Sequence, residues 1–314
     1  MYYSCMTIKE QLELIKKVSG QSQEKLASEL GVSFPTLNSW INGRSEPRTK
    51  ARERIQGLFK RLTGQAVIPP DVLRAKKQAL FTQAQRHKKI LEVLFKNKDI
   101  YDQFVLSLTY HTNRIEGSSL TEPETAAILF QNAALPDKTI IEQMEVKNHQ
   151  AVLQYVFRHI QEERNLNEAF ILKTHGILLN GIQEDAGRYR SHGVRIVGSN
   201  IPTANHLKVP DLMQALMKDI NAKSLDVTAH VTEIHSRFEQ IHPFSDGNGR
   251  VGRLLLDAML LRKNLPPAVI RQEKRRFYIL YLNKAQREKE FSQLEDFICD
   301  AILDGFAILK RKTD

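Results

Sequence analysis

The spacing of hydrophobic residues predicts helices over most of the chain. In residues 8–62 the apolar side chains fall at helical intervals within short amphipathic stretches. From about residue 99 to the end, apolar residues again recur three and four positions apart, as in the sets Leu153, Val156, Phe157, Ile160 and Val231, Ile234, Phe238, Ile241. The pattern therefore predicts an all-α protein.

Residues 187–202 depart from this periodicity. Their β-branched residues lie between glycines, and Pro202 closes the stretch. Such a composition is typical of a short β-hairpin. We therefore expect a helical core with one small hairpin flap over it.

Two short helices are expected near the N-terminus, within residues 22–44. Ser22 can cap the first helix, and Gly31 supplies the left-handed turn that ends it. Ser33 can cap the second helix, whose apolar face contains Leu37, Trp40 and Ile41. Two helices joined in this way form a helix-turn-helix, and the stretch resembles the lambda-repressor/Cro type.

This resemblance implies a surface that reads DNA bases. Its candidate residues are Gln23, Phe34, Pro35, Thr36, Asn38 and Ser39, with Arg44 and Arg48 near the phosphates. The alternative is a helical module that docks on another protein, since the same fold serves both purposes.

Charge is distributed unevenly along the chain, whose net charge is +10. Residues 1–98 contain 19 Lys and Arg against 8 Asp and Glu, and the remainder contains 27 against 28. The asymmetry favours an N-terminal module that meets a polyanion, although a solvated basic face would have the same composition.

The two cysteines, Cys5 and Cys299, lie at opposite ends of the chain. They provide no disulfide framework and no metal-binding CxxC pair. The apolar run around residues 254–261 is interrupted by Asp257, so no segment is expected to enter a membrane. We therefore expect a cytoplasmic protein.

Three regions are expected along the chain. Residues 1–64 form the helix-turn-helix domain, and residues 65–98, with the pair Pro69-Pro70 near their start, form a linker and a connecting helix. Residues 99–314 form the larger helical domain.

The segment from His242 to Arg253, His-Pro-Phe-Ser-Asp-Gly-Asn-Gly-Arg-Val-Gly-Arg, contains the candidate chemistry. Gly247 and Gly249 form a tight turn before a new helix, where backbone N–H groups can converge on an anion. His242 can accept a proton near neutral pH at the end of the preceding helix.

The charged residues of this segment suit a polyphosphate. Arg250 and Arg253 are three apart, so two guanidinium groups can hold neighbouring phosphates. Asp246 offers one carboxylate to a Mg²⁺ ion that keeps several waters and bridges phosphate oxygens. Each element alone is usually structural; together within twelve residues they indicate a nucleotide site.

The whole segment matches the signature of the Fic family, His-x-Phe-x-Asp/Glu-Gly-Asn-Gly-Arg-x-x-Arg, at every defined position. The resemblance extends over roughly residues 100–305, including Gly187-Arg-Tyr-Arg190 and Arg276-Phe-Tyr278. It implies a protein adenylyltransferase, which uses ATP as co-substrate.

The resemblance also implies roles for individual residues. His242 is the expected base that deprotonates a Ser, Thr or Tyr hydroxyl of a target protein, Phe244 a buried anchor, and Asp246 the Mg²⁺ ligand. The expected ATP-binding residues are Gly247, Asn248, Gly249, Arg250, Val251, Gly252, Arg253, Val197, Gly198, Ser199, Asn200, Tyr278 and Gln286. Among them Arg250 is assigned to the β-phosphate, Arg253 to the γ-phosphate, and Tyr278 and Gln286 to adenine.

A second motif lies at Thr112-Asn-Arg-Ile-Glu-Gly117. Taken alone it would be a helix end with a surface glutamate. It also resembles the inhibitory motif of one Fic subclass, Ser/Thr-x-x-x-Glu-Gly/Asn, which implies that Glu116 pairs with Arg253 and takes the place of the γ-phosphate. In some relatives the same glutamate positions a water that removes AMP, so a brake, a hydrolytic residue or both remain open.

The expected function is thus an autoinhibited protein adenylyltransferase that transfers AMP to a protein hydroxyl. The alternative is a DNA-binding transcriptional regulator whose Fic domain only senses a nucleotide. A homodimer is compatible with the resemblance, and the target protein cannot be derived from the sequence.

Overall fold

The computed structural model describes residues 7–63, 68–196 and 201–310. Its contacts divide the chain into two compact units, Met1–Arg74 and Ala75–Asp314. All regular structure in the described ranges is helical, so the predicted helical class is confirmed there.

The first unit has a hydrophobic core of its own, to which Leu12, Leu26, Leu37 and Phe59 contribute. Its helices are α1 (Ile8–Ser19), α2 (Gln23–Leu30), α3 (Phe34–Ile41) and α4 (Thr49–Thr63). As predicted, Ser22 and Ser33 cap α2 and α3, each by accepting a hydrogen bond from a backbone N–H of the first turn.

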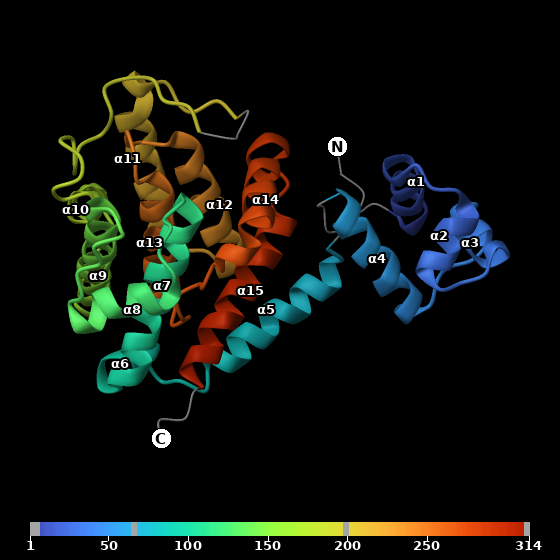
Figure 1. Cartoon of the computed structure of the whole chain (residues 1–314), viewed down its shortest axis with the longest axis horizontal. Coiled ribbons are helices and arrows are strands. Elements are labelled where there is room, and N and C mark those ends of the chain that lie inside the picture. Colours follow the sequence, from blue (N-terminus) through green and yellow to red (C-terminus); the bar gives the residue numbers. More distant parts are fainter. Residues whose placement is uncertain (1–6, 64–67, 197–200, 311–314) are drawn as a thin grey trace. The chain divides into compact units, whose positions relative to one another are not determined.

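The helices of the second unit pack around one central helix, α13 (Figure 1). Its helices are α5 (Pro70–Ala84, shared with the first unit), α6 (Ile90–Lys96), α7 (Lys98–Glu116), α8 (Glu122–Gln131), α9 (Ile140–Gln161), α10 (Glu168–Leu178), α11 (Val209–Ile220), α12 (Val227–Ile241), α13 (Asn248–Arg262), α14 (Arg275–Glu288) and α15 (Ser292–Leu309). Two 3₁₀ turns, His206–Lys208 and Gln272–Lys274, precede α11 and α14.

Helix α13 is the central one, because it contacts α7, α9, α10 and α12. Thirteen of its 15 residues are buried, as expected for a helix enclosed on all sides. Its first turns contain the second half of the His242–Arg253 segment, so the candidate chemistry is fixed to a buried, central helix.

The predicted hairpin is not seen. Residues 187–196 and 201–205 contain no strand, and the predicted tip, residues 197–200, lies outside the described residues. The backbone here is held instead by Arg190, whose guanidinium donates hydrogen bonds to the carbonyl oxygens of His192 and Ala204. These contacts satisfy carbonyl groups that a hairpin would have paired with a neighbouring strand.

Helix α5 is attached to the second unit by its lysines. Lys76 forms ion pairs with Asp296 and Asp300 of α15, and Lys77 forms one with Glu295. The boundary between the two units falls within this helix, between Arg74 and Ala75.

None of the helices in the described ranges has both the length and the apolar composition needed to cross a lipid bilayer.

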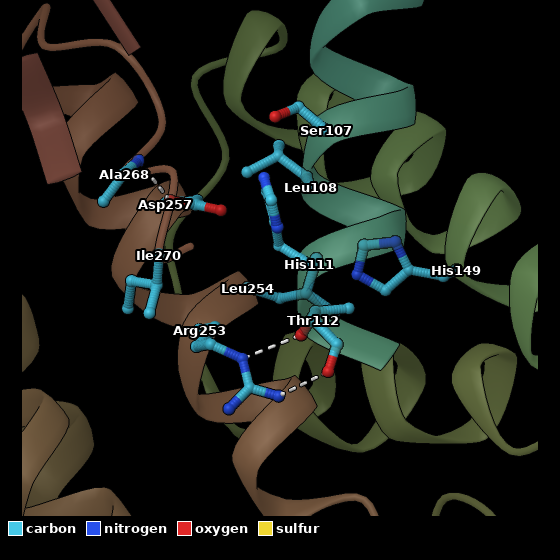
Figure 2. A pocket seen from close by; sticks show the side chains of 10 residues that line it. All are labelled: Ser107, Leu108, His111, Thr112, His149, Arg253, Leu254, Asp257, Ala268 and Ile270. Atoms are coloured by element: carbon cyan, nitrogen blue, oxygen red, sulfur yellow. Dashed lines mark hydrogen bonds between the residues drawn. The ribbon is translucent and has the colours of Figure 1, made fainter. Parts of the chain in front are cut away.

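A small internal cavity of about 20 Å³ lies between α7, α9 and α13, which is room for one water molecule (Figure 2). Asp257 of α13 faces it, 4% exposed, and accepts a hydrogen bond of 2.8 Å from the Ala268 N–H. Burial raises the pKa of this carboxyl to about 8, so Asp257 is neutral at pH 7.

We predict that Asp257→Asn makes the domain's stability less dependent on pH. The unfolded carboxyl titrates near its ordinary value of 3.8 and the folded one near 8, so the folded state binds the extra proton between these values. The stability that Asp257 contributes is complete below the lower pKa and is lost as pH rises toward 8, by about 1.4 kcal/mol per unit. Asparagine has the same shape and no proton to lose.

Melting temperatures measured by calorimetry from pH 5 to 9 test this prediction. The melting temperature of Asp257→Asn minus that of the wild type should increase with pH up to about pH 8 and then remain constant. Asp211→Asn, at an exposed position of α11, is the control. Parallel curves for wild type and Asp257→Asn would contradict a neutral buried acid.

Candidate active site

The turn between α12 and α13 lines a cavity of about 690 Å³. Gly247 precedes α13 with a φ of +74°, a conformation that glycine adopts without strain. Because the first N–H groups of a helix lack partners within it, the start of α13 offers donors to an anion in this cavity. A side chain at Gly249 would meet Glu116 Oε1 at 2.5 Å, so the glycine leaves room for the Glu116 side chain.

Asn248 fixes the shape of this turn. Its side chain accepts a hydrogen bond from the Phe244 N–H and donates one to the Phe244 carbonyl, both at 2.8 Å. These two bonds hold the amide against the backbone of the loop. The sequence assigned this residue to a phosphate and did not reveal its structural part.

Phe244 is the buried anchor that the sequence predicted, with 0% exposure. Its ring stacks on His175 of α10 at a centroid distance of 3.8 Å. His175 Nδ1 accepts a hydrogen bond from the Gly187 N–H, so Nε2 holds the proton and donates to the Asp246 carbonyl at 3.2 Å. Burial lowers the pKa of His175 to about 4, which keeps it neutral. The spacing of residues gave no sign of His175.

His242 ends α12 in a left-handed conformation with a φ of +53°. Its Nδ1 lies 3.2 Å from the Glu239 carbonyl, which can only accept a hydrogen bond, so Nδ1 holds the proton. The Nε2 atom therefore keeps its lone pair. Burial lowers the pKa of His242, so a residue that lines the cavity is neutral and able to accept a proton at neutral pH.

Arg190 holds the backbone around His242. Its side-chain Nε donates a hydrogen bond to the His242 carbonyl at 2.7 Å, and its backbone N–H donates one to the Pro243 carbonyl at 3.0 Å. The side chain is 3% exposed and satisfies its donors with carbonyl groups, so it locks this turn without adding an acceptor. The left-handed strain at His242 is maintained by such external bonds.

Arg253 of α13 is held by α7 at two points. Its Nε donates to Thr112 Oγ1 at 2.7 Å (Figure 2), and its Nη2 contacts Glu116 Oε1 at 2.5 Å. Thr112 is buried, whereas the Glu116 side chain is 38% exposed at the cavity. Arg275 of α14 donates to the Ile115 carbonyl at 2.7 Å and so fixes the end of α7. The contact between Glu116 and Arg253 that the resemblance implied is present.

The pair is ionised. Burial raises the pKa of Glu116, but the charge of Arg253 and its hydrogen bond lower it by more, so the pKa lies below its ordinary value. For Arg253, burial lowers the pKa and Glu116 raises it by more. A charge-assisted hydrogen bond therefore occupies this guanidinium group.

Arg250 lies between two carboxylates. It is 2% exposed, its Nη1 contacts Glu145 of α9 at 2.5 Å, and its Nη2 lies 3.4 Å from Oδ2 of Asp246, a residue that lines the cavity. Of the two arginines, Arg253 lines the cavity directly. Three residues of separation put both on neighbouring helical positions, but the helices packed against α13 determine where each side chain points.

Tyr278 and Gln286 of α14 line the far part of the cavity. The Tyr278 hydroxyl lies 2.7 Å from His235 Nε2, and Gln286 donates to the Ser236 carbonyl at 3.0 Å. Both are at least 96% buried, with exposures of 1% and 4%. Tyr278 and Gln286, which the resemblance assigned to adenine, therefore line the same cavity as His242.

The remaining predicted nucleotide residues are placed differently. Val251 is fully buried and does not line the cavity, and Gly252 lies against the Glu239 carboxyl. The segment Val197–Asn200 lies outside the described residues.

Asp246 is the predicted metal ligand. Its side chain is 52% exposed and lines the cavity, and one oxygen accepts a hydrogen bond from the Gly247 N–H at 2.6 Å. No cluster of three or more His, Cys, Asp or Glu suited to a metal exists among the described residues. A single carboxylate still fits Mg²⁺, which takes its other ligands from water and phosphate.

The candidate DNA surface follows α3. Arg44 and Arg48 are exposed, and the more polar positions are half-buried, namely Gln23, Thr36, Asn38 and Ser39. Several of these bond locally: Ser39 Oγ lies 2.8 Å from Ser45 Oγ. Phe34 is 41% exposed, which is unusual for a phenylalanine with no partner to cover it.

Two family models match the chain. The model described as Fic/DOC family matches residues 165–260, and the one described as Helix-turn-helix matches residues 20–51.

Curated relatives are named protein adenylyltransferase Fic. The protein from Nematostella vectensis is 35% identical over 198 residues, which is 60% of this chain and 44% of the relative. The protein from Drosophila willistoni is 30% identical over 207 residues, 65% of this chain and 40% of the relative. The chain thus spans less than half the length of these relatives.

Solved structures share the fold. A Fic domain containing signaling protein from Bacteroides thetaiotaomicron has a TM-score of 0.66 at 24% identity, covering 76% of this chain and 99% of that one. Fic-1 (residues 134–508) from C. elegans has a TM-score of 0.67 at 21% identity, covering 97% and 88%. Residues 165–260 therefore match the Fic/DOC family model in sequence, residues 20–51 match the helix-turn-helix model, and the solved structures share the fold.

Proposed function

We propose that this chain is an autoinhibited protein adenylyltransferase, which transfers AMP from ATP to a Ser, Thr or Tyr hydroxyl of a target protein. The observation that supports it best is His242, a neutral imidazole whose lone pair is left free beside the anion-binding start of α13. The names of the curated relatives agree with this reaction.

In this proposal the nucleotide enters the cavity with its phosphates at the start of α13. The backbone N–H groups after Gly247 bind phosphate oxygens, and Arg253 binds the terminal phosphate once Glu116 releases it. Tyr278 and Gln286 flank the base at the other end of the cavity. The segment Val197–Asn200 remains our candidate for aligning the target and covering the nucleoside.

The transfer itself needs one base. His242 Nε2 takes the proton of the target hydroxyl, and the oxygen attacks the α-phosphorus in line. A new oxygen–phosphorus bond forms, the bond between the α-phosphorus and its bridging oxygen breaks, and pyrophosphate leaves with that electron pair. Most of the rate comes from positioning and from donors that stabilise the phosphate charge.

Mg²⁺ belongs to the proposal through Asp246. When bound, it would neutralise phosphate charge and favour the departure of pyrophosphate. The chain's own share is to keep the Asp246 carboxylate at the edge of the site, where the hydrogen bond from Gly247 orients it.

Glu116 serves as a brake in this proposal. It takes the donor of Arg253 that the terminal phosphate needs, so ATP cannot place its α-phosphorus in line. The same carboxylate stands near the phosphate site, where it could instead orient a water for removal of AMP. Both actions use one residue, and the assay below separates them by following gain and loss of label.

A second candidate function follows from the first unit. Its match to the helix-turn-helix model and its basic composition favour a DNA-binding regulator whose second unit senses a nucleotide. A free histidine base is not needed for sensing, which is why we rank transfer first. The free, buried thiol of Cys299 accords with a reducing, cytoplasmic setting for either function.

We predict that His242→Ala abolishes AMP transfer and leaves ATP affinity within a few fold. A positioned base contributes roughly 10² to 10⁴ in rate and little to ground-state binding. Labelling of a cell lysate with α-labelled ATP measures transfer, and calorimetry measures binding. His230→Ala, about three turns earlier on α12, is the control. Loss of ATP binding in His242→Ala would mean that the histidine is structural.

We predict that Glu116→Gly raises AMP transfer, including self-modification, by an order of magnitude or more. The substitution removes a charge-assisted bond, worth about 1.5 to 3 kcal/mol, from the resting state. Arg253→Ala should silence the freed enzyme, because the terminal phosphate then has no guanidinium partner. The wild type, the two single mutants and the double mutant Glu116→Gly/Arg253→Ala are compared by incorporation and release of label at one ATP concentration.

Glu162→Gly is the matched control, since Glu162 also ends a helix and is exposed there. Equal transfer by wild type and Glu116→Gly would exclude a brake. A fast Glu116→Gly/Arg253→Ala double mutant would exclude the role of Arg253.

We predict that the chain binds duplex DNA with an affinity that falls steeply with salt, because lysines and arginines release counterions from the phosphates. The slope of log affinity against log salt is negative, and Arg44→Gln should make it shallower by about one. Lys223→Gln, exposed in the second unit, should leave the slope unchanged. Absence of binding at low salt would move the first unit to the protein-docking alternative.

A further inference from the structure

Glu239, on the last turn of α12, is a buried acid in the wall of the nucleotide cavity that the proposed reaction does not use. It is 6% exposed, and within the described part of the chain its Oε1 has no hydrogen-bond partner. A buried polar atom without a partner requires an explanation, such as a catalytic role or a bound water or ion, and this one belongs to a residue that lines the cavity. The backbone carbonyl of Glu239 already accepts a hydrogen bond from His242 Nδ1. The role of its carboxyl group is still unassigned.

The position of this carboxyl is closely defined. A side chain at Gly252 would meet Glu239 Oε1 at 2.2 Å and Phe238 at 3.1 Å, so α13 brings only a glycine backbone against it. The same turn of α13 carries Arg253, whose charge acts on Glu239 together with that of Glu116. Glu239 thus lies beside the turn of α13 that carries Arg253, the proposed partner of the terminal phosphate.

The charges around Glu239 come from several elements. Arg253 of α13, Glu116 of α7 and Tyr278 of α14 act on it, and His242 ends its own helix. Helices α11 and α15 also pack on α12, but their polar contacts with it are made at other positions, Arg237 and Thr228.

Burial raises the pKa of Glu239 to about 7; Arg253 lowers it and Glu116 raises it by smaller amounts. The site therefore contains one ionised carboxylate, Glu116, and a second acid that is close to half protonated at neutral pH. The nearby histidines do not share this titration, because burial lowers the pKa of His235 to about 3 and that of His242 below its ordinary value.

We propose that Glu239 is a nucleotide-contacting acid: its neutral carboxyl donates a hydrogen bond to the terminal phosphate beside Arg253, and its ionised form repels that phosphate. The inference rests on the proposed function and adds to it a residue that distinguishes a triphosphate from a diphosphate. It also gives the site a pH range, since loss of one proton turns a donor into a competing anion for Arg253.

Calorimetric titration of the full chain with ATP and with ADP at pH 6.5 and 8.5 tests this proposal. For wild type we expect ATP to bind about tenfold more weakly at the higher pH, and ADP to change much less. Glu239→Gln, which keeps the shape and an N–H donor at every pH, should bind ATP at pH 8.5 nearly as tightly as wild type does at pH 6.5.

Two control variants make the test specific. Glu233→Gln, at an exposed position of the same helix, should behave as wild type. Asp257→Asn removes the other acid of raised pKa near Arg253 and should keep the pH dependence. The same titrations with Glu116→Gly and Glu116→Gly/Glu239→Gln show whether the effect remains when the brake is absent.

The possible outcomes distinguish a failure of this inference from a failure of the proposed function. If ATP binds but Glu239→Gln keeps the wild-type pH dependence, or if ADP shows the same change as ATP, this inference is wrong and the proposed function stands. If the pH dependence disappears in Asp257→Asn instead, the inference is also wrong. If no nucleotide binds to any chain, with or without Glu116, the proposed function fails and the inference with it.

Discussion

The ion pair between Glu116 and Arg253 is the interaction on which the site depends. A guanidinium group on a central helix is buried, and burial of a charge is costly unless the charge is paired and hydrogen-bonded. Helix α7 meets this need with the Thr112 hydroxyl at the buried end and the Glu116 carboxylate at the open end. A ligand that replaces Glu116 must therefore bring a negative charge of its own, as the phosphates of the proposed nucleotide would.

The contacts that hold His242 are separate from the Glu116–Arg253 ion pair. Arg190 binds the backbone on both sides of His242, and Phe244 anchors the following turn against His175. In the proposed function, release of Arg253 by Glu116 would therefore change the charge in the cavity without breaking the contacts that hold His242.

The sequence was most informative where local chemistry decides the structure. Serine caps, the glycine before α13 and the burial of Phe244 follow from residue type and spacing, and the structure contains all of them. The Glu116–Arg253 contact joins residues 137 positions apart, and no local rule links them; it followed from resemblance to a family. The predicted hairpin is absent from the described residues because β-branched composition indicates extended backbone but does not provide a partner strand.

Tertiary packing explains what the sequence could not give. Arg250 and Arg253 are equivalent by spacing, yet α9 draws the first to Glu145 and α7 draws the second to Thr112 and Glu116.

The same packing selects the protonation of the acids around α13. Glu116 keeps its charge because it is hydrogen-bonded to the Arg253 guanidinium, while Asp257 of α13 and Glu239 of α12, which have no such ion pair, have raised pKa values because of burial. A single arginine at this place cannot satisfy three ionised carboxylates without losing its own affinity for phosphate. Because Asp257 is neutral at pH 7 and Glu239 is close to half protonated, Glu116 is the main ionised partner of Arg253, and in the proposed function it is the one that a phosphate has to replace.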